Sequence, residues 1–115
     1  MITIYHNPRC SKSRDALALL QQHTSEPLNV IEYLKTPPSE AELSAILAKL
    51  NIPARSLLRT GESDYTSLQL DNPELTEQQL IKAMTEHPKL IERPIVVIGD
   101  RAAIGRPLSN VSAIL

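Results

Sequence analysis

Hydrophobic and polar positions alternate at the start of the chain and give way to other patterns further along. The alternation in Ile2-Thr3-Ile4-Tyr5 predicts a first strand, and residues 28–33 predict a second. The segment at residues 94–98 is apolar throughout, which is typical of a central strand with both faces covered. Residues 101–105 follow a Gly99-Asp100 turn, so we expect them to pair back antiparallel on that strand.

Other segments repeat their apolar residues at helical spacing. Residues 11–23 predict a first helix, which the sequence Ser25-Glu26-Pro27 interrupts. This helix and its two flanking strands fit in about 30 residues, as a parallel crossover requires. Residues 107–114 are expected to form a terminal helix.

Two capping boxes predict where helices begin in the middle of the chain. Ser39 with Glu42 precedes apolar residues at 43, 46, 47 and 50, which share one helical face, and Pro53 ends that helix. Thr76 with Gln79 begins another, which stops at His87-Pro88. Residues 55–59 predict a short helix, and the rest of the segment 54–74 is expected to be a loop.

The order of these elements predicts an α/β fold of the thioredoxin-like type. We expect a mixed four-stranded sheet with flanking helices and a helical insertion between strands two and three. A length of 115 residues suits one domain, so residues 1–115 are expected to be a single domain. Thioredoxin-like folds have a cis proline before the third strand, and Arg93-Pro94 stands at that position.

The composition of the chain limits the classes of function that we expect for this protein. With 12 basic and 13 acidic residues the net charge is −1, which gives no reason to expect nucleic-acid or acidic-membrane binding. Neither a membrane-spanning run nor a signal peptide is recognisable. One cysteine cannot form an internal disulfide, which fits a reducing cytoplasm, and the scattered histidines show no metal-ligand spacing. We therefore expect a cytoplasmic protein with no metal, and a monomer.

The single cysteine, Cys10, stands where a strand ends and a helix begins. A thiol at a helix N-terminus faces unpaired backbone N–H groups and the positive end of the helix dipole, and both favour the thiolate. Arg9, Lys12 and Arg14 add positive charge nearby. This is the environment of a reactive sulfur and not that of an inert buried thiol.

Three more arginines are candidates for an anion site around this thiol. In a thioredoxin-like sheet, the turn before strand three lies at the same edge as the end of strand one, so Arg93 is expected beside Cys10. Arg106 follows the fourth strand, and Arg59 ends the short helical segment. Guanidinium groups offer paired planar donors that match carboxylate and tetrahedral oxyanions, and they lower the pKa of a neighbouring thiol.

Two other side chains near Cys10 have two interpretations each. His6 either packs against the first helix or tunes the thiol, and Ser13 either helps to cap the helix or acts on the sulfur.

Four motifs in order resemble the glutaredoxin-coupled arsenate reductases, the ArsC-type proteins of bacteria. They are His-Asn-Pro-x-Cys-x-x-Ser-Arg at 6–14, Leu-Leu-Arg at 57–59, Ile-Glu-Arg-Pro-Ile-Val-Val at 91–97 and Ile-Gly-Arg-Pro at 104–107. Well-characterised members have Gly-Thr where this chain has Ser11-Lys12.

The resemblance implies roles for the site residues and names the partners of the reaction. Cys10 corresponds to the nucleophile that forms an adduct with arsenate, and the oxyanion is held by Arg59, Arg93 and Arg106. His6 and Ser13 match positions that support the thiolate. No bound cofactor is implied. Glutathione is the co-substrate that attacks the adduct, a glutaredoxin takes up the oxidising equivalent, and arsenite leaves.

Two other functions are compatible with parts of the sequence. The fold family includes Spx-type regulators that bind RNA polymerase, but their Cys-x-x-Cys switch is impossible here because position 13 is serine. Cys-x-x-Ser also resembles monothiol oxidoreductases acting on glutathione mixed disulfides. Disulfide exchange does not require three arginines around an oxyanion, which favours the reductase.

Overall fold

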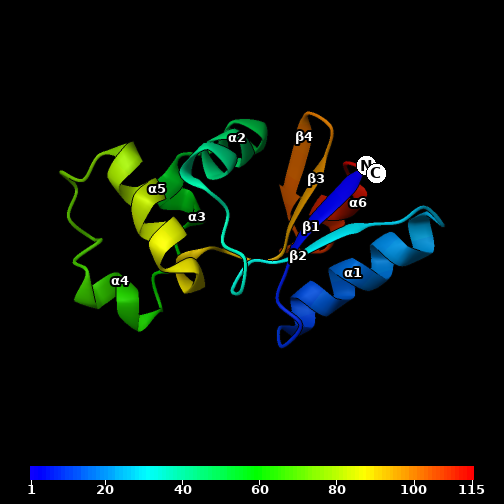
Figure 1. The fold of residues 1–115 in the computed structure, drawn as a ribbon, viewed down its shortest axis with the longest axis horizontal. Helices are drawn as coiled ribbons and strands as arrows, with labels where there is room; N and C mark the ends of the chain where they lie inside the picture. Colours follow the sequence, from blue (N-terminus) through cyan, green and yellow to red (C-terminus); the bar gives the residue numbers. More distant parts are fainter. The chain divides into compact units, whose positions relative to one another are not determined.

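The computed structural model describes all residues, 1–115, and divides them into two compact units. Unit 1 comprises Met1–Thr36 and Arg93–Leu115, and unit 2 comprises Pro37–Glu92. Unit 1 holds the sheet and two helices, whereas unit 2 is helical (Figure 1). The helical insertion predicted between strands two and three is therefore confirmed, since the chain leaves unit 1 after the second strand and returns just before the third.

Unit 1 is built on a mixed four-stranded sheet, as predicted. Its strands are β1 (Ile2–His6), β2 (Asn29–Glu32), β3 (Ile95–Ile98) and β4 (Arg101–Ile104), in the order β2-β1-β3-β4. β1 runs parallel to β2 and antiparallel to β3, and β3 pairs antiparallel with β4. The apolar segment at 94–98 thus supplies a central strand.

The register of the sheet sets which residues meet at its edge. His6 pairs with Glu32 on β2, Tyr5 pairs with Ile95 on β3, and Ile95 pairs with Ile104 on β4. The end of β1, the end of β2, the start of β3 and the end of β4 consequently lie side by side. Three segments at this edge carry candidate site residues. Cys10 follows β1, Arg93 precedes β3 and Arg106 follows β4.

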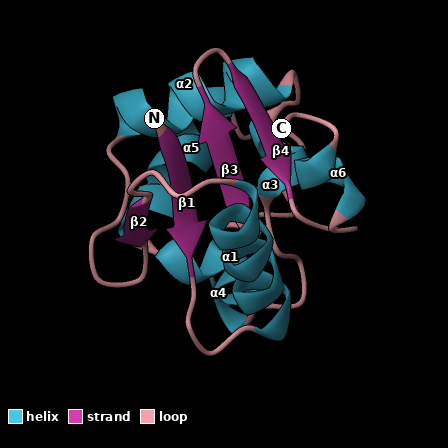
Figure 2. Ribbon diagram, turned by 90° about the vertical axis from the view of Figure 1, so that its right-hand side faces the viewer, coloured by secondary structure: helices cyan, strands magenta, loops and turns pink.

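One face of the sheet is covered by the helices α1 (Ser11–His23) and α6 (Ser109–Ser112) (Figure 2). Ile4 and Val96 are paired across β1 and β3, and both are fully buried. They pack with side chains from the two helices, which are Ala16, Leu20 and Val111. This aliphatic cluster packs α1, the helix that follows Cys10, against β1 and β3.

Unit 2 contains the helices α2 (Glu40–Leu50), α3 (Ala54–Leu57), α4 (Ser63–Ser67) and α5 (Glu77–Glu86), and a 3₁₀ turn, η1 (Pro88–Leu90). Both predicted capping boxes are present: Ser39 and Glu42 bond reciprocally at α2, and Thr76 and Gln79 do so at α5. An antiparallel bridge between Leu58 and Ile91 closes the unit.

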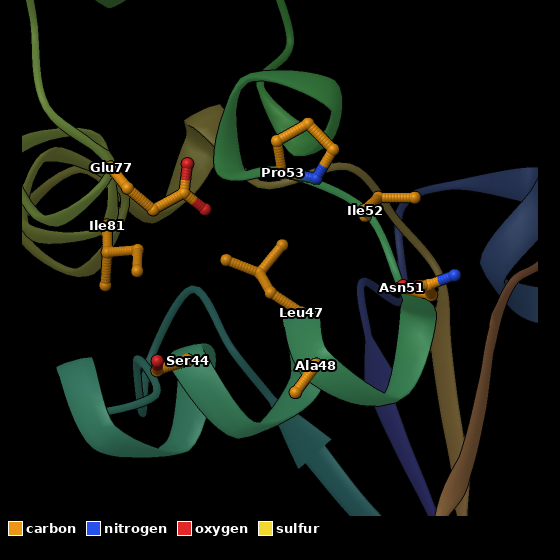
Figure 3. Close-up of a pocket in the computed structure, with 8 residues that line it drawn as sticks. All are labelled: Ser44, Leu47, Ala48, Asn51, Ile52, Pro53, Glu77 and Ile81. Carbon is orange, nitrogen blue, oxygen red and sulfur yellow. The ribbon is translucent and has the colours of Figure 1, made fainter.

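A cavity of about 420 Å³ lies between α2, the segment that follows it and α5 (Figure 3). Leu47 and Ile81 lie on its opposite sides. At one side Glu77 accepts a 2.7 Å hydrogen bond from the N–H of Ala54, the first residue of α3. This carboxylate satisfies a helix N–H that has no partner within its own helix.

Helix α4 corrects the expectation that the rest of 54–74 is a loop. The helix spans Ser63–Ser67 and buries none of its residues. A helix without a buried face leaves no apolar periodicity in the sequence, so the pattern could not reveal it. None of the helices is long and apolar enough to cross a bilayer.

Gly105, directly after β4, lies in close contact with Pro94. Its N–H donates to the carbonyl of Pro94 over 2.9 Å, and a Cβ at this position would come within 2.8 Å of Cγ of Pro94. Only a glycine allows the two segments that carry Arg93 and Arg106 to approach this closely.

Gly105→Ala should therefore lower the free energy of unfolding by about 1–3 kcal/mol, because the added methyl overpacks against a buried ring. Urea unfolding followed by circular dichroism measures the change. Gly61→Ala is the matched control, since no atom lies within 4 Å of the Cβ it adds. Equal stability of the two variants would contradict the proposed contact.

Candidate active site

A hydrogen-bonded turn carries the chain from β1 to Cys10. The N–H of Cys10 donates to the carbonyl of Asn7 over 3.0 Å, and the N–H of Arg9 donates to Oδ1 of the same asparagine over 3.0 Å. Nη1 of Arg14, one turn into α1, donates to the carbonyl of Pro8 over 2.9 Å. The turn is thereby fastened both to itself and to the helix that follows.

Cys10 occupies the N-cap position of α1, with extended backbone angles (φ −96°, ψ 122°). The thiol is half-buried and free. At this position the backbone N–H groups of Lys12 and Ser13 favour the ionised form of the sulfur. Those N–H groups belong to the first turn of the helix, where no carbonyl of the helix can reach them.

The environment of Cys10 lowers its pKa. Burial, the largest contribution, raises the pKa, but four others oppose it and outweigh it. They are, in decreasing order, the N–H of Ser13, the charge of Arg93, the N–H of Lys12 and the charge of Arg106. The sulfur is thus prepared to ionise before any substrate arrives.

Arg106 makes the direct side-chain contact with the nucleophile. Its Nη2 lies 3.3 Å from Sγ of Cys10, and its Nε donates to the carbonyl of Arg93 over 2.7 Å. The side-chain amide of Asn110 holds the carbonyls of Ile104 and Arg106 at 3.1 and 3.2 Å. The two predicted arginines of unit 1 are therefore brought to the sulfur as expected.

Each of these arginines precedes a cis proline. The Arg93-Pro94 peptide bond is cis, as the thioredoxin-like order predicts. The Arg106-Pro107 bond is cis as well, which no pattern in the sequence indicated.

His6 and Ser13 form a buried pair beneath the turn. Nδ1 of His6 lies 2.7 Å from Oγ of Ser13, and that hydroxyl oxygen also accepts from the N–H of Asn7 over 3.0 Å. Burial, the largest effect, lowers the pKa of His6, and the positive charge of Arg14 lowers it further. The Glu32 carboxylate raises the pKa, but the net change is downward. The imidazole is therefore neutral at neutral pH. The Ser13 side chain fastens the turn, and its backbone N–H lowers the pKa of Cys10.

Arg59 belongs to unit 2 and has partners there. Its Nη1 forms a 2.8 Å ion pair with Glu62 and donates to the carbonyl of Lys89 over 3.2 Å. Its N–H donates to the carbonyl of Leu90. The contribution of Arg59 to the oxyanion site stays a prediction.

The sequence did not single out three residues that hold this site together, namely Asn7, Arg14 and Asn110. The Asn-Pro turn signal was present for Asn7, because asparagine often bonds the backbone two residues further on. The sequence indicated the positive charge of Arg14 but not its bond to the carbonyl of Pro8. Nothing marked Asn110, because its partners lie on a segment whose path the sequence does not reveal.

The arrangement can perform one kind of chemistry well. A thiolate that two backbone N–H groups favour is a nucleophile, and adjacent guanidinium groups attract and orient an anionic electrophile. A tetrahedral oxyanion bound there would contact both the sulfur and the guanidinium groups that neutralise the charge of the oxyanion.

Comparison with known proteins identifies a family and close relatives. The sequence profile of the ArsC family matches residues 5–114. A protein of Neisseria meningitidis named arsenate reductase is 48% identical over 115 residues, which are 99% of this chain and 97% of that protein. One of Haemophilus influenzae with the same name is 49% identical and covers 99% and 98%. A solved structure titled arsenate reductase from Vibrio cholerae has a TM-score of 0.94 at 46% identity and covers 99% and 97%.

The rate of Cys10 alkylation by iodoacetamide should rise with pH with an inflection below about 8.5, the value of a free cysteine. Arg106→Gln removes a positive charge that favours the thiolate, so the inflection should move upward and the rate at pH 7 should fall. Arg101→Gln, on the exposed far end of β4, should leave the profile unchanged. An inflection at the free-cysteine value in the parent protein would refute the activated thiol.

Proposed function

Because this chain belongs to the ArsC family, we propose that it is an arsenate reductase that uses Cys10 as its nucleophile. The observation that carries the proposal is the contact of the Arg106 guanidinium with the Cys10 sulfur at 3.3 Å, within a site whose N–H donors also favour the thiolate. A guanidinium group that stabilises the thiolate in the free enzyme can neutralise the negative charge of an oxyanion once the sulfur has bonded to it.

The first step follows from these charges. The thiolate attacks arsenic(V), and one arsenic-bound hydroxyl takes up a proton from solvent and leaves as water, which gives an adduct with a sulfur–arsenic bond. Arg93 and Arg106 neutralise the oxygens of the adduct through hydrogen bonds to charged donors. We assign the same role to Arg59, which ends the matched motif at 57–59.

The lone cysteine decides where the electrons come from. Reduction of arsenic(V) to arsenic(III) takes two electrons, which are supplied when two thiols become one disulfide. The chain has a single thiol, and that thiol is the nucleophile. We therefore propose that glutathione binds the arsenic adduct and that a glutaredoxin thiol then attacks the glutathione sulfur. The electron pair of the glutathione–arsenic bond stays on arsenic, which becomes arsenic(III), and the mixed disulfide holds the oxidising equivalent. Water then hydrolyses the bond between arsenic and Cys10, and arsenite leaves.

His6 and Ser13 act on the sulfur through the turn. The buried imidazole fixes the Ser13 hydroxyl, which accepts from the N–H of Asn7, and the backbone N–H of Ser13 lowers the pKa of the thiol. These are positioning roles, since neither side chain contacts the substrate in this scheme.

Three further proposals complete the assignment. We propose that the two units act as one domain, because unit 2 is inserted into unit 1 and both carry arginines of the matched motifs. We propose that the enzyme works as a monomer and in the cytoplasm, where glutathione is kept reduced. The arginines at Cys10 favour an oxyanion substrate over a mixed disulfide, and no observation supports binding to RNA polymerase.

Cys10→Ser should abolish arsenate reduction, with a loss of at least about a thousandfold in turnover, because a serine hydroxyl does not ionise near neutral pH. The assay follows NADPH oxidation with glutathione, glutaredoxin and glutathione reductase supplied. Circular dichroism checks that the variant is folded. Turnover that survives the substitution would remove Cys10 as nucleophile.

Arg59→Gln should raise KM for arsenate by about tenfold or more, the cost of losing a charged hydrogen bond. The same coupled assay at varied arsenate concentration measures it, with Arg101→Gln as the control that keeps the parent KM. An unchanged KM in Arg59→Gln would leave oxyanion binding to Arg93 and Arg106 alone.

A further inference from the structure

A second cavity, in unit 1, lies beside the Cys10 turn, and the proposed mechanism has not used it. Its volume is about 450 Å³, within the range of about 300–1,000 Å³ that is usual for small-molecule sites. One wall is formed by residues 6–9, and the other by Glu32, Leu34 and Lys35. These are the segments that follow β1 and β2, two parallel strands in which His6 pairs with Glu32. Crevices at the carboxyl ends of parallel strands are where ligands bind in open α/β sheets.

Both walls are held in place by hydrogen bonds. On the β1 side, Asn7 receives the N–H groups of Arg9 and Cys10, and Arg14 holds the carbonyl of Pro8. On the β2 side, the N–H groups of Lys35 and Thr36 donate to the carbonyl of Glu32 over 3.0 and 2.9 Å. A pocket between two fixed turns loses little entropy when it binds a ligand.

The charges on the walls form a definite pattern. Arg9 and Lys35 supply two cations, and Glu32 supplies one anion. Lys35 and Glu32 approach to 3.5 Å, but their side chains are 78% and 43% exposed, so this pair is weak and can be exchanged for a ligand. The complementary ligand carries two anionic groups and one cationic group. Leu34, which is also exposed, offers an apolar surface among them.

The pocket and the arginines lie on opposite sides of the nucleophile along the sheet edge. The strand order β2-β1-β3-β4 places Arg93, before β3, and Arg106, after β4, on one side of the turn that follows β1. The pocket, between β1 and β2, lies on the other. An oxyanion held by the arginines therefore leaves the β2 side open to a second reactant.

We propose that this pocket binds the thiol co-substrate, a short peptide with two carboxylates, one ammonium and a central thiol, which is the charge pattern of glutathione. Arg9 and Lys35 bind its carboxylates, Glu32 binds its ammonium, and the thiol extends over the Asn7–Arg9 turn toward the arsenic on Cys10. The inference rests on the proposed function and adds the site from which the reductant acts.

The step that this site serves is a substitution at arsenic. The peptide thiol forms a sulfur–arsenic bond, an arsenic-bound hydroxyl leaves, and the thiol proton leaves with it as water. The oxidation state of arsenic does not change until the next thiol attacks. The pocket has to hold the peptide only while its thiol reaches the adduct.

The test uses S-methylglutathione, which keeps all three charges but cannot react. Added to the ¹⁵N-labelled protein without arsenate, it should shift the amide signals of Asn7, Arg9, Leu34 and Lys35 in a saturable manner. Lys35→Gln and Arg9→Gln should each weaken binding by about threefold to fivefold, the effect of one exposed ion pair. Arg101→Gln, a cation at the opposite end of the sheet, should not alter it.

Kinetics provide a second readout. Lys35→Gln should raise KM for glutathione by a similar factor, and KM for arsenate should stay at the parent value. With 2-mercaptoethanol, an uncharged thiol, Lys35→Gln and the parent protein should show equal rates. Amide shifts confined to Arg93 and residues 104–106, or no saturable shift at all, would overturn the pocket. Arsenate turnover with no binding at the pocket removes only this inference, whereas binding without turnover removes the reductase and leaves the pocket intact.

Discussion

The contact between the guanidinium of Arg106 and the sulfur of Cys10 joins residues that are 96 positions apart in the chain. It forms only if β4 ends at the edge where β1 ends, and β4 reaches that edge because β3 runs antiparallel to both β1 and β4. The side chain is further fixed by the bond from its Nε to the carbonyl of Arg93. The chemistry of the site therefore depends on the register of the sheet.

The close approach at Gly105 shows how narrow this constraint is. The two arginine-bearing segments meet at Gly105 and Pro94, where even one additional methyl group would collide with the proline ring. Val111 would also lie 3.4 Å from that methyl group, and it belongs with Ile4 and Val96 to the buried cluster that holds the strands and α6 together. Packing thus sets the distance between the guanidinium groups of Arg93 and Arg106 and the sulfur of Cys10.

The site balances two opposing electrostatic effects. Burial disfavours the charged sulfur, and it would make the thiol inert without the donors around it. The N–H groups at the start of α1 and the two guanidiniums reverse that effect, and the same burial strengthens their interactions by excluding water. The turn that presents the sulfur separates two regions of different charge pattern, so the site has room for an oxyanion on one side and for a charged thiol on the other.

Local patterns in the sequence were sufficient for most of the fold. Helix α1 has the predicted bounds, 11–23, and both capping boxes form. Each of these features depends on residues close together in the chain, which sequence spacing reports directly. The order of the elements then sufficed for a thioredoxin-like sheet, and a cysteine after β1 implied a thiol at a helix start.

Other features became visible only in the tertiary structure. They are the cis bond at Arg106-Pro107, the support that Asn110 gives to Arg106, and the pocket between the turns after β1 and β2. Helix α4 also escaped the sequence, because it buries no apolar face. The spacing of residues along a chain encodes local hydrogen bonding and amphipathic faces. Strand pairing and close packing decide which atoms meet at a site, and no single segment of the sequence specifies them.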